Sequence, residues 1–268
     1  MATLVCLHAH PDDEAMSTGG TMARAKAEGH RVVLVVATNG EHGEVPEDLR
    51  DGETLVDRRR TETAASAAAL GVDRVVWLGY RDSGMTGWEQ NADPSSFLQA
   101  DVDEAARRLA DVLEEESADV LTTYDWHGNY GHPDHVKVHR VGHRAAELAG
   151  TARVLEATMN RDAIVRMMEE HRAPDEVFGE NAADFDPNGP ADDGNPFGTA
   201  EADITLAVDV DAYVDRKRAA IAAHRSQTTD TTMFLQMPEE VFRAAFRTEW
   251  YIEPGVEGAG PRPGWIFP

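Results

Sequence analysis

Short apolar runs of strand length alternate with helical patterns along most of this 268-residue chain. The run over 32–37, Val-Val-Leu-Val-Val-Ala, is rich in β-branched residues and has no polar alternate positions. Such a run is typical of a strand buried on both faces of a parallel sheet. Parallel strands need crossovers, and helical patterns that end at Gly29, Gly71 and Gly150 supply them. The sequence therefore predicts an α/β fold, a Rossmann-like three-layer sandwich with a mostly parallel sheet.

The same patterns predict the order of the elements. Strands are expected at 3–7, 32–37, 74–80, 119–123, 153–159, 204–210 and, as an edge strand, 250–252. Helices are expected at 14–29, 56–70, 101–116, 132–148, 161–171, 212–224 and, last and short, from Pro238. The acidic, proline-containing segment 172–203 has no periodicity and is expected to be a long loop or lid. We interpret residues 1–268 as one domain, with the active site at the carboxyl edge of the strands.

Charge and cysteine content restrict the partners and the compartment. The formal net charge is −24, and only three of the 25 basic residues are lysines, which argues against a nucleic acid or an anionic membrane as partner. No window approaches the roughly 18 apolar residues of a membrane span. The single cysteine, Cys6, lies in the first apolar run, and a buried thiol fits a reducing cytosol. We expect a cytoplasmic protein, and a homo-oligomer remains open.

A cluster of imidazoles and carboxylates, His-Ala-His-Pro-Asp-Asp-Glu at 8–14, follows the first predicted strand. A turn at Pro11 and the first helical turn can direct His10 and Asp13, three residues apart, at one centre. Asp12 lies between them and is aimed differently, so the cluster suggests a metal with a proton acceptor beside it. Helix capping could explain the acidic residues, but it explains neither the histidines nor a second such cluster.

The second cluster, Tyr-Gly-His-Pro-Asp-His at 130–135, follows the fourth predicted strand. A catalytic zinc site takes three protein ligands and an open position for water, so one more ligand is needed. His132, His135 and His139 compete for this place, and spacing alone does not decide among them. A His/His/Asp set suits Zn²⁺ and also Fe²⁺. A nucleotide-binding fold is disfavoured, because the first strand-to-helix turn has no G-x-G-x-x-G.

Both clusters resemble the LmbE/PIG-L family of zinc-dependent N-deacetylases, which carries A-H-P-D-D-E after its first strand and H-P-D-H after a later one. The resemblance covers residues 3 to about 160, and a weaker similarity extends to about 250. It implies that His135 is the third metal ligand beside His10 and Asp13, and that His139 is a packed or surface residue. Short stretches at 40–44, 59–62, 81–85 and 123–125 look like the branch that handles GlcNAc-inositol and mycothiol-type substrates.

The residues beside the metal ligands suggest a division of the proton work. Asp12 is placed to take a proton from metal-bound water as the water attacks an amide carbonyl. His132, near the metal but not bound to it, can stabilise the oxyanion and protonate the departing amine, with Asp134 orienting it. We expect it to stay protonated up to high pH. In the resembling enzymes the tyrosine that matches Tyr130 contacts the substrate or the oxyanion.

The resemblance also implies a substrate-binding set. Glu44, Arg59 and Asp82 match sugar-contacting positions, and Met85 lies on the same loop as Asp82. Glu41 is expected to be solvated. The function implied is metal-dependent hydrolysis of an N-acetyl group on an amino-sugar conjugate of the GlcNAc-inositol type, releasing acetate and a free amine. The alternative is an amidase of the same family that acts on a mycothiol S-conjugate or an acylated natural product.

Overall fold

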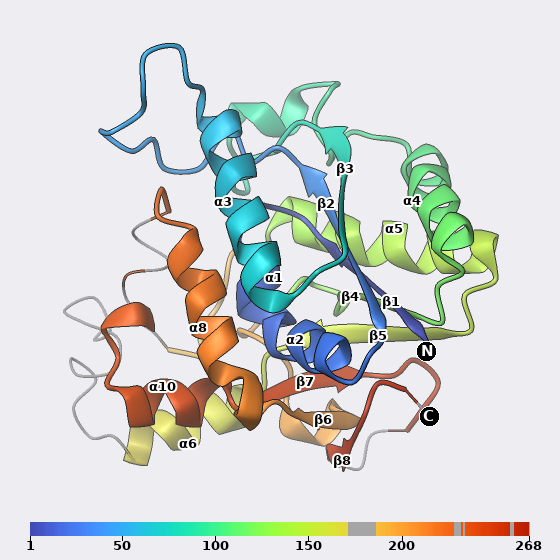
Figure 1. Ribbon diagram of the computed structural model, residues 1–268, viewed down its shortest axis with the longest axis vertical. Coiled ribbons are helices and arrows are strands. Elements are labelled where there is room, and N and C mark those ends of the chain that lie inside the picture. Colours follow the sequence, from blue (N-terminus) through green and yellow to red (C-terminus); the bar gives the residue numbers. More distant parts are fainter. Residues whose placement is uncertain (171–185, 228–231, 233, 258–259, 268) are drawn as a thin grey trace.

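The computed structural model describes residues 1–170, 186–227, 232, 234–257 and 260–267. Its strands form one sheet in the order β3-β2-β1-β4-β5-β7-β6-β8 (Figure 1). Their bounds are β1 Thr3–His8, β2 Arg31–Thr38, β3 Arg74–Tyr80, β4 Val120–Tyr124, β5 Arg153–Thr158, β6 Leu206–Asp209, β7 Thr248–Ile252 and β8 Arg262–Gly264. Strand β7 pairs antiparallel with both β5 and β6, and the other pairings between these strands are parallel. The predicted α/β class and mostly parallel sheet are confirmed.

Helices lie on both faces of this sheet. Their bounds are α1 Asp13–Ser17, α2 Gly19–Ala27, α3 Leu55–Leu70, α4 Val102–Glu116, α5 Pro133–Ala149, α6 Arg161–Glu170, α8 Val214–Ala223 and α10 Glu239–Phe246. Short 3-10 turns occupy Glu89–Ala92, Glu201–Asp203 and Asp211–Tyr213. Helices α1, α2 and α3 pack against α8, while α4 packs against α5 (Figure 1). Right-handed crossovers place these two groups on opposite faces, because the chain runs outward from β1 to β3 and then returns past β1 to β4.

The centre of the sheet is buried on both sides, as the sequence predicts. Every residue of 32–37 in β2 is inaccessible to solvent, and all five residues of β4 are buried. Each apolar side chain removed from water stabilises the fold, by roughly 1.5–3 kcal/mol for a large one. The described residues contain no helix long and apolar enough to cross a membrane.

Two expectations about the elements are wrong. The helix expected over 14–29 is two helices, because the backbone breaks at Thr18, whose hydroxyl bonds the His8 ring at 2.8 Å. The strand expected at the edge over 250–252 is β7, which lies inside the sheet with β5 on one side and β6 on the other. Its Tyr251 is fully buried and donates to the Thr21 hydroxyl at 2.8 Å, so this strand ties the C-terminal part to α2.

The expected loop or lid over 172–203 lies partly outside the described residues, since its first described residue is Asp186. The described part, 186–203, packs against the loop after β4: the amide of Asp192 donates to the Tyr130 carbonyl at 2.9 Å, and that of Gly198 to the Asn129 carbonyl at 2.6 Å. The eight strands of the described residues, from residue 3 to residue 264, join in one sheet.

Strand order fixes where a site can form. The connections from β1 and from β4 leave the sheet in opposite directions, although these two strands are neighbours. At such a switch point the loops after the two strands separate and leave a crevice at the carboxyl edge. The two sequence clusters are these two loops.

Candidate metal centre and active site

Side chains from the two clusters meet at the switch point. His10 and Asp13 come from the turn between β1 and α1, and His132 and His135 from the start of α5. The ring centres of His10 and His135 are 5.3 Å apart, and that of His132 is 4.6 Å from the first and 5.1 Å from the second. All three rings are buried. Residues about 120 positions apart in the sequence thus share one small polar centre.

The donor set fits a metal ion. The Gly128 carbonyl accepts from Nδ1 of His135 at 3.2 Å, so the lone pair of this ring is on Nε2. That Nε2 is buried without a hydrogen-bond partner and lies 3.4 Å from Oδ1 of Asp13. A ring nitrogen and a carboxylate oxygen this close, with no hydrogen bond of good geometry between them, can both bind a cation placed there. Burial acts to raise the pKa of Asp13, yet His135 and His10 hold it well below the ordinary value, so this carboxylate is anionic.

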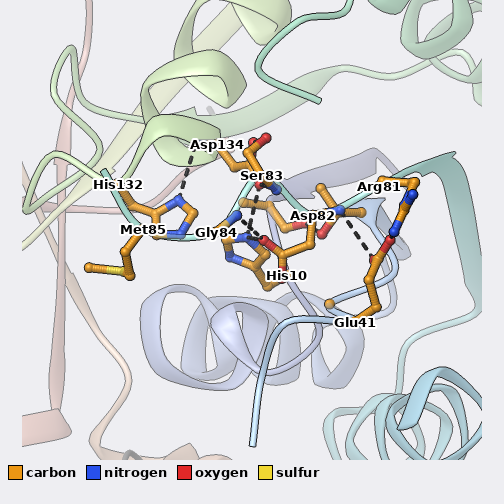
Figure 2. A network of polar contacts seen from close by, with 12 residues as sticks. His10, Glu41, Arg81, Asp82, Ser83, Gly84, Met85, His132 and Asp134 are labelled. Carbon is orange, nitrogen blue, oxygen red and sulfur yellow. Dashed lines mark hydrogen bonds and ion pairs between the residues drawn. The ribbon is translucent and has the colours of Figure 1, made fainter. Parts of the chain in front are cut away.

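His10 is the third expected ligand, and a carboxylate holds its ring through the other nitrogen. Its Nε2 bonds the Asp134 carboxylate at 3.2 Å, while Nδ1 lies 3.5 Å from Oδ2 of Asp13. Figure 2 shows Asp134 in turn held by Ser83, whose amide donates to it at 2.9 Å. A carboxylate on the far nitrogen is the usual way that a metal-binding histidine is oriented. Burial disfavours the imidazolium, yet Asp82, Asp13 and Asp134 raise the pKa of His10 well above its ordinary value, so the centre favours positive charge.

The structure brings together the three expected ligands, His10, Asp13 and His135, and adds His132 to the group. Ligand atoms of His10, His132 and His135 lie within 4.8 Å of one another, as do those of His10, Asp82 and Asp134. More than one combination of these side chains can therefore bind a metal ion. His139 lies one turn further along α5 and bonds the Tyr124 carbonyl at 3.0 Å, away from this group.

Asp12 stands beside the ligands in an unusual conformation. Its φ is +113°, outside the range that residues with a side chain favour. Its carboxylate is mostly buried and accepts from Nη2 of Arg59 at 3.0 Å. Burial raises the pKa of Asp12 to about 6, although Arg59 acts in the opposite direction. A carboxylate that titrates near the working pH is suited to exchanging protons.

His132 differs from the sequence interpretation. Burial lowers its pKa to about 2, and the neighbouring His10 and His135 add to this, so the ring is neutral at neutral pH rather than protonated. The Asp134 carboxylate contacts His10 and not this ring; only the backbone amide of Asp134 reaches it, donating to Nδ1 at 3.1 Å. Nδ1 therefore carries the lone pair and Nε2 the hydrogen. His132 is a neutral N–H donor at this site.

The expected substrate residues have different surroundings. Arg59 is 3% exposed and donates to the carbonyls of Pro11 and Gly40 as well as to Asp12, so its guanidinium is committed to the loops of the site. Asp82 is 5% exposed, accepts from the Gly84 amide at 2.8 Å and lies 3.5 Å from Nε2 of His10.

The remaining expected residues line the same edge. Glu44, Met85 and Tyr130 are half-buried, and the Tyr130 ring is 4.9 Å from that of His135. Glu41 is not solvated as expected: it accepts from Arg81 at 3.1 Å and from the Asp82 amide at 3.2 Å (Figure 2). It thereby fixes the loop that carries Asp82.

A group of residues that the sequence analysis missed supports the site from behind. After α8 the chain reads His224-Arg-Ser-Gln227, and this segment contacts three of the site's own elements. Ser226 donates to Glu62 on α3 from its amide at 2.9 Å and its hydroxyl at 2.6 Å, and Gln227 accepts from the Glu44 amide at 3.0 Å. His224 bonds Glu14. The available signal was a run of polar residues directly after a predicted helix.

Comparisons with known proteins identify a family and a shared fold. Residues 5–146 match the family described as GlcNAc-PI de-N-acetylase, PIG-L. A protein of Acidothermus cellulolyticus named 1D-myo-inositol 2-acetamido-2-deoxy-alpha-D-glucopyranoside deacetylase is 39% identical, covering 93% of this chain and 88% of its own. A protein of that name from Thermobifida fusca is 40% identical, covering 97% and 95%. The crystal structure of the conserved protein TT1542 from Thermus thermophilus has a TM-score of 0.59 at 22% identity over 95% of both chains, which shows a shared fold.

Proposed function

The chain belongs to the GlcNAc-PI de-N-acetylase (PIG-L) family, and from this we propose that it hydrolyses the acetamide of a GlcNAc-inositol conjugate, releasing acetate and a free amine. The curated relatives named above carry this activity in their names and match nearly the whole chain. The observation that carries the proposal is the buried, unpartnered Nε2 of His135 facing the Asp13 carboxylate, with Asp12 beside it.

We propose that His10, Asp13 and His135 hold one divalent cation, Zn²⁺ in the first place and Fe²⁺ as the alternative. When bound, such an ion polarises a carbonyl and lowers the pKa of a coordinated water to about 7. A fourth protein ligand would leave less room for water, so His132 is assigned to the substrate and not to the metal. Its hydrogen on Nε2 supports this role.

The chemical step is assigned to two residues of this chain. Asp12, ionised above its pKa of about 6, accepts a proton from the attacking water. His132 donates its Nε2 hydrogen bond to the carbonyl oxygen as negative charge develops there. Because His132 is neutral, the proton that the departing amine needs is returned by Asp12. The C–N bond then breaks, and acetate and the amine are the products.

Recognition of the sugar and its aglycone is assigned to the loops at this edge. Asp82, Glu44, Met85 and Tyr130 line it, and their carboxylates and phenol can bond hydroxyl groups. Burial favours the neutral form of Asp82, but His10 outweighs it and lowers the pKa, so this carboxylate stays ionised. Arg59 instead holds the loops in place through its hydrogen bonds to Pro11, Asp12 and Gly40. We also expect the enzyme in the cytosol, since Cys6 is fully buried in β1 as a free thiol.

An amidase of the same family that acts on a mycothiol S-conjugate or an acylated natural product is the second candidate, because both reactions use the same central residues. The test is incubation of the metal-loaded enzyme with GlcNAc-inositol and, separately, with a thiol conjugate, followed by detection of the primary amine. We expect faster release from GlcNAc-inositol. Release from the thiol conjugate alone would contradict the proposed substrate.

A further inference from the structure

The backbone of Asp12 is held in a conformation that its side chain disfavours. Its φ of +113° is rare for any residue other than glycine. Such conformations persist only where surrounding contacts hold them, and they often mark functional positions. Glycine would relieve the strain but would remove the carboxylate. The contacts that hold this peptide therefore decide where the carboxylate points.

One of these contacts is a carboxylate with no exposure to solvent. The Asp12 amide donates to Oε2 of Glu14 at 3.0 Å, and Glu14 is 0% exposed. Its other oxygen, Oε1, accepts from Nε2 of His224 at 2.7 Å and from the Ser66 hydroxyl. A buried carboxylate is stable only when such partners satisfy both oxygens. Glu14 thus connects the Asp12 peptide to α3 and to the end of α8.

His224 comes from a distant part of the chain. It directly follows α8, which packs against α1 and α3 (Figure 1), and its own side chain is 0% exposed. The ring does not touch the proposed metal ligands or line the substrate edge; its side-chain hydrogen bond is to Glu14. His224 is therefore connected to the Asp12 peptide by hydrogen bonds through Glu14, and its charge also acts to lower the pKa of Asp12.

We propose that His224 and Glu14 are positioning residues that hold the left-handed Asp12 peptide and so aim the Asp12 carboxylate at the reacting water. The inference rests on the proposed deacetylase function, in which Asp12 is the base. Partners that orient the residues of a metal site typically contribute about 10- to 100-fold to affinity or activity. Here the contribution falls on the chemical step, because neither residue contacts the substrate edge.

The experiment compares three variants of the full chain loaded with zinc. His224→Ala removes the bond to Glu14, and we expect kcat to fall about 10- to 100-fold while KM and zinc content stay within about twofold of wild type. His224→Gln places an amide N–H near the position of Nε2 and should restore most of kcat. His143→Ala is the matched control, since His143 bonds a different carboxylate, Glu156, at a similar 2.8 Å, and should leave kcat unchanged.

A second measurement does not depend on turnover. Hydrogen exchange of the Asp12 amide, followed by NMR, should be faster in His224→Ala than in wild type and His224→Gln, because the Glu14 acceptor loses its anchor. If His224→Ala does not fold, the comparison uses His224→Asn, whose shorter side chain cannot reach Glu14 as Gln does. Unchanged kcat and unchanged Asp12 exchange would overturn the proposal.

The two proposals fail in different ways. Loss of zinc or a raised KM in His224→Ala, with no restoration by Gln, would assign His224 a merely structural role and overturn the inference. Absence of acetate release by the wild-type enzyme would instead contradict the proposed function. In that case the exchange of the Asp12 amide still reports whether His224 holds this peptide.

Discussion

His135 rests against the backbone of Gly128. The Gly128 carbonyl accepts from Nδ1 of the ring at 3.2 Å, and a Cβ atom at position 128 would lie 2.2 Å from Cβ of His135. Gly128 also has a φ of +64°, which suits glycine. The loop after β4 can therefore cover α5 and orient this ring only if residue 128 has no side chain.

Gly128→Ala should weaken metal binding about 10- to 100-fold, because the added methyl group must displace His135 or its loop. Competition with a chelator in zinc titrations measures this change. Gly52→Ala is the control: Gly52 also has a positive φ, +80°, but nothing lies within 4 Å of a Cβ there. An equal loss of zinc affinity in the two variants would show that backbone strain, and not the contact with His135, is responsible, and wild-type affinity in both would contradict the prediction.

His135→Ala should abolish stoichiometric metal content, since its Nε2 is the unpartnered donor facing Asp13. His139→Ala should keep the metal, because His139 bonds the Tyr124 carbonyl and lies away from this group. Elemental analysis after dialysis against a metal-free buffer checks both. Retention of zinc by the first variant and loss by the second would contradict the ligand assignment.

Arg59→Met should lower kcat by at least about 10-fold, because it removes the contact with Asp12 and the bonds that join Pro11 to Gly40. Arg60→Met is matched to it by chemistry and position, and should have little effect, since Arg60 is exposed and bonds Asn39. Steady-state kinetics on GlcNAc-inositol distinguishes a role of Arg59 in positioning the loops from a role in binding the substrate. A rise in KM with kcat unchanged would return it to substrate binding.

His132→Gln should keep more activity than His132→Ala, because glutamine retains a neutral N–H donor close to the position of Nε2. Removal of one donor to a developing oxyanion typically lowers kcat by about 10²- to 10³-fold. We expect a loss of that order for the alanine variant, with the metal retained. Equal losses in the two variants would instead support an imidazolium acid.

The sequence predicts the N-terminal half of the fold well, because its signals are local. The buried run of β2 and the glycines after the helices appear in the pattern itself, and two short motifs after β1 and β4 bring His10, Asp13 and His135 together. The position of β7 has no local signal. An alternating strand with Glu249 and Tyr251 facing inward looks like an edge strand until its partners on both sides are known.

Some properties of the site likewise have no local signal in the sequence. The pKa of His132 and the burial of Arg59 depend on what surrounds them in space, and spacing along the chain does not report this. His224 is the clearest case, since 210 residues separate it from Glu14. Only the packing of α8 against α1 and α3 makes them neighbours.

A last prediction concerns stability at the opposite, amino edge of the sheet. Glu116, at the end of α4, has a side chain that is 5% exposed and accepts from Arg31 and Arg74, which begin β2 and β3. Hydrogen bonding to Arg31 is the main cause that lowers the pKa of Glu116 to about 2 from 4.5. A carboxyl group whose pKa is lower in the folded state stabilises the fold above its unfolded pKa, and this contribution disappears as the pH falls through the folded pKa.

Glu116→Gln should therefore be less stable than wild type at pH 7, by about 1 kcal/mol because both arginines are partly exposed and screened. The difference should shrink as the pH falls from about 4.5 toward 2. Urea denaturation of both proteins from pH 7 to the lowest pH at which they fold measures it. Glu114→Gln is the control, since Glu114 is half exposed and lies 3.9 Å from Arg107. A difference between wild type and Glu116→Gln that persists undiminished in acid would show that the charge of Glu116 is not what ties α4 to the sheet.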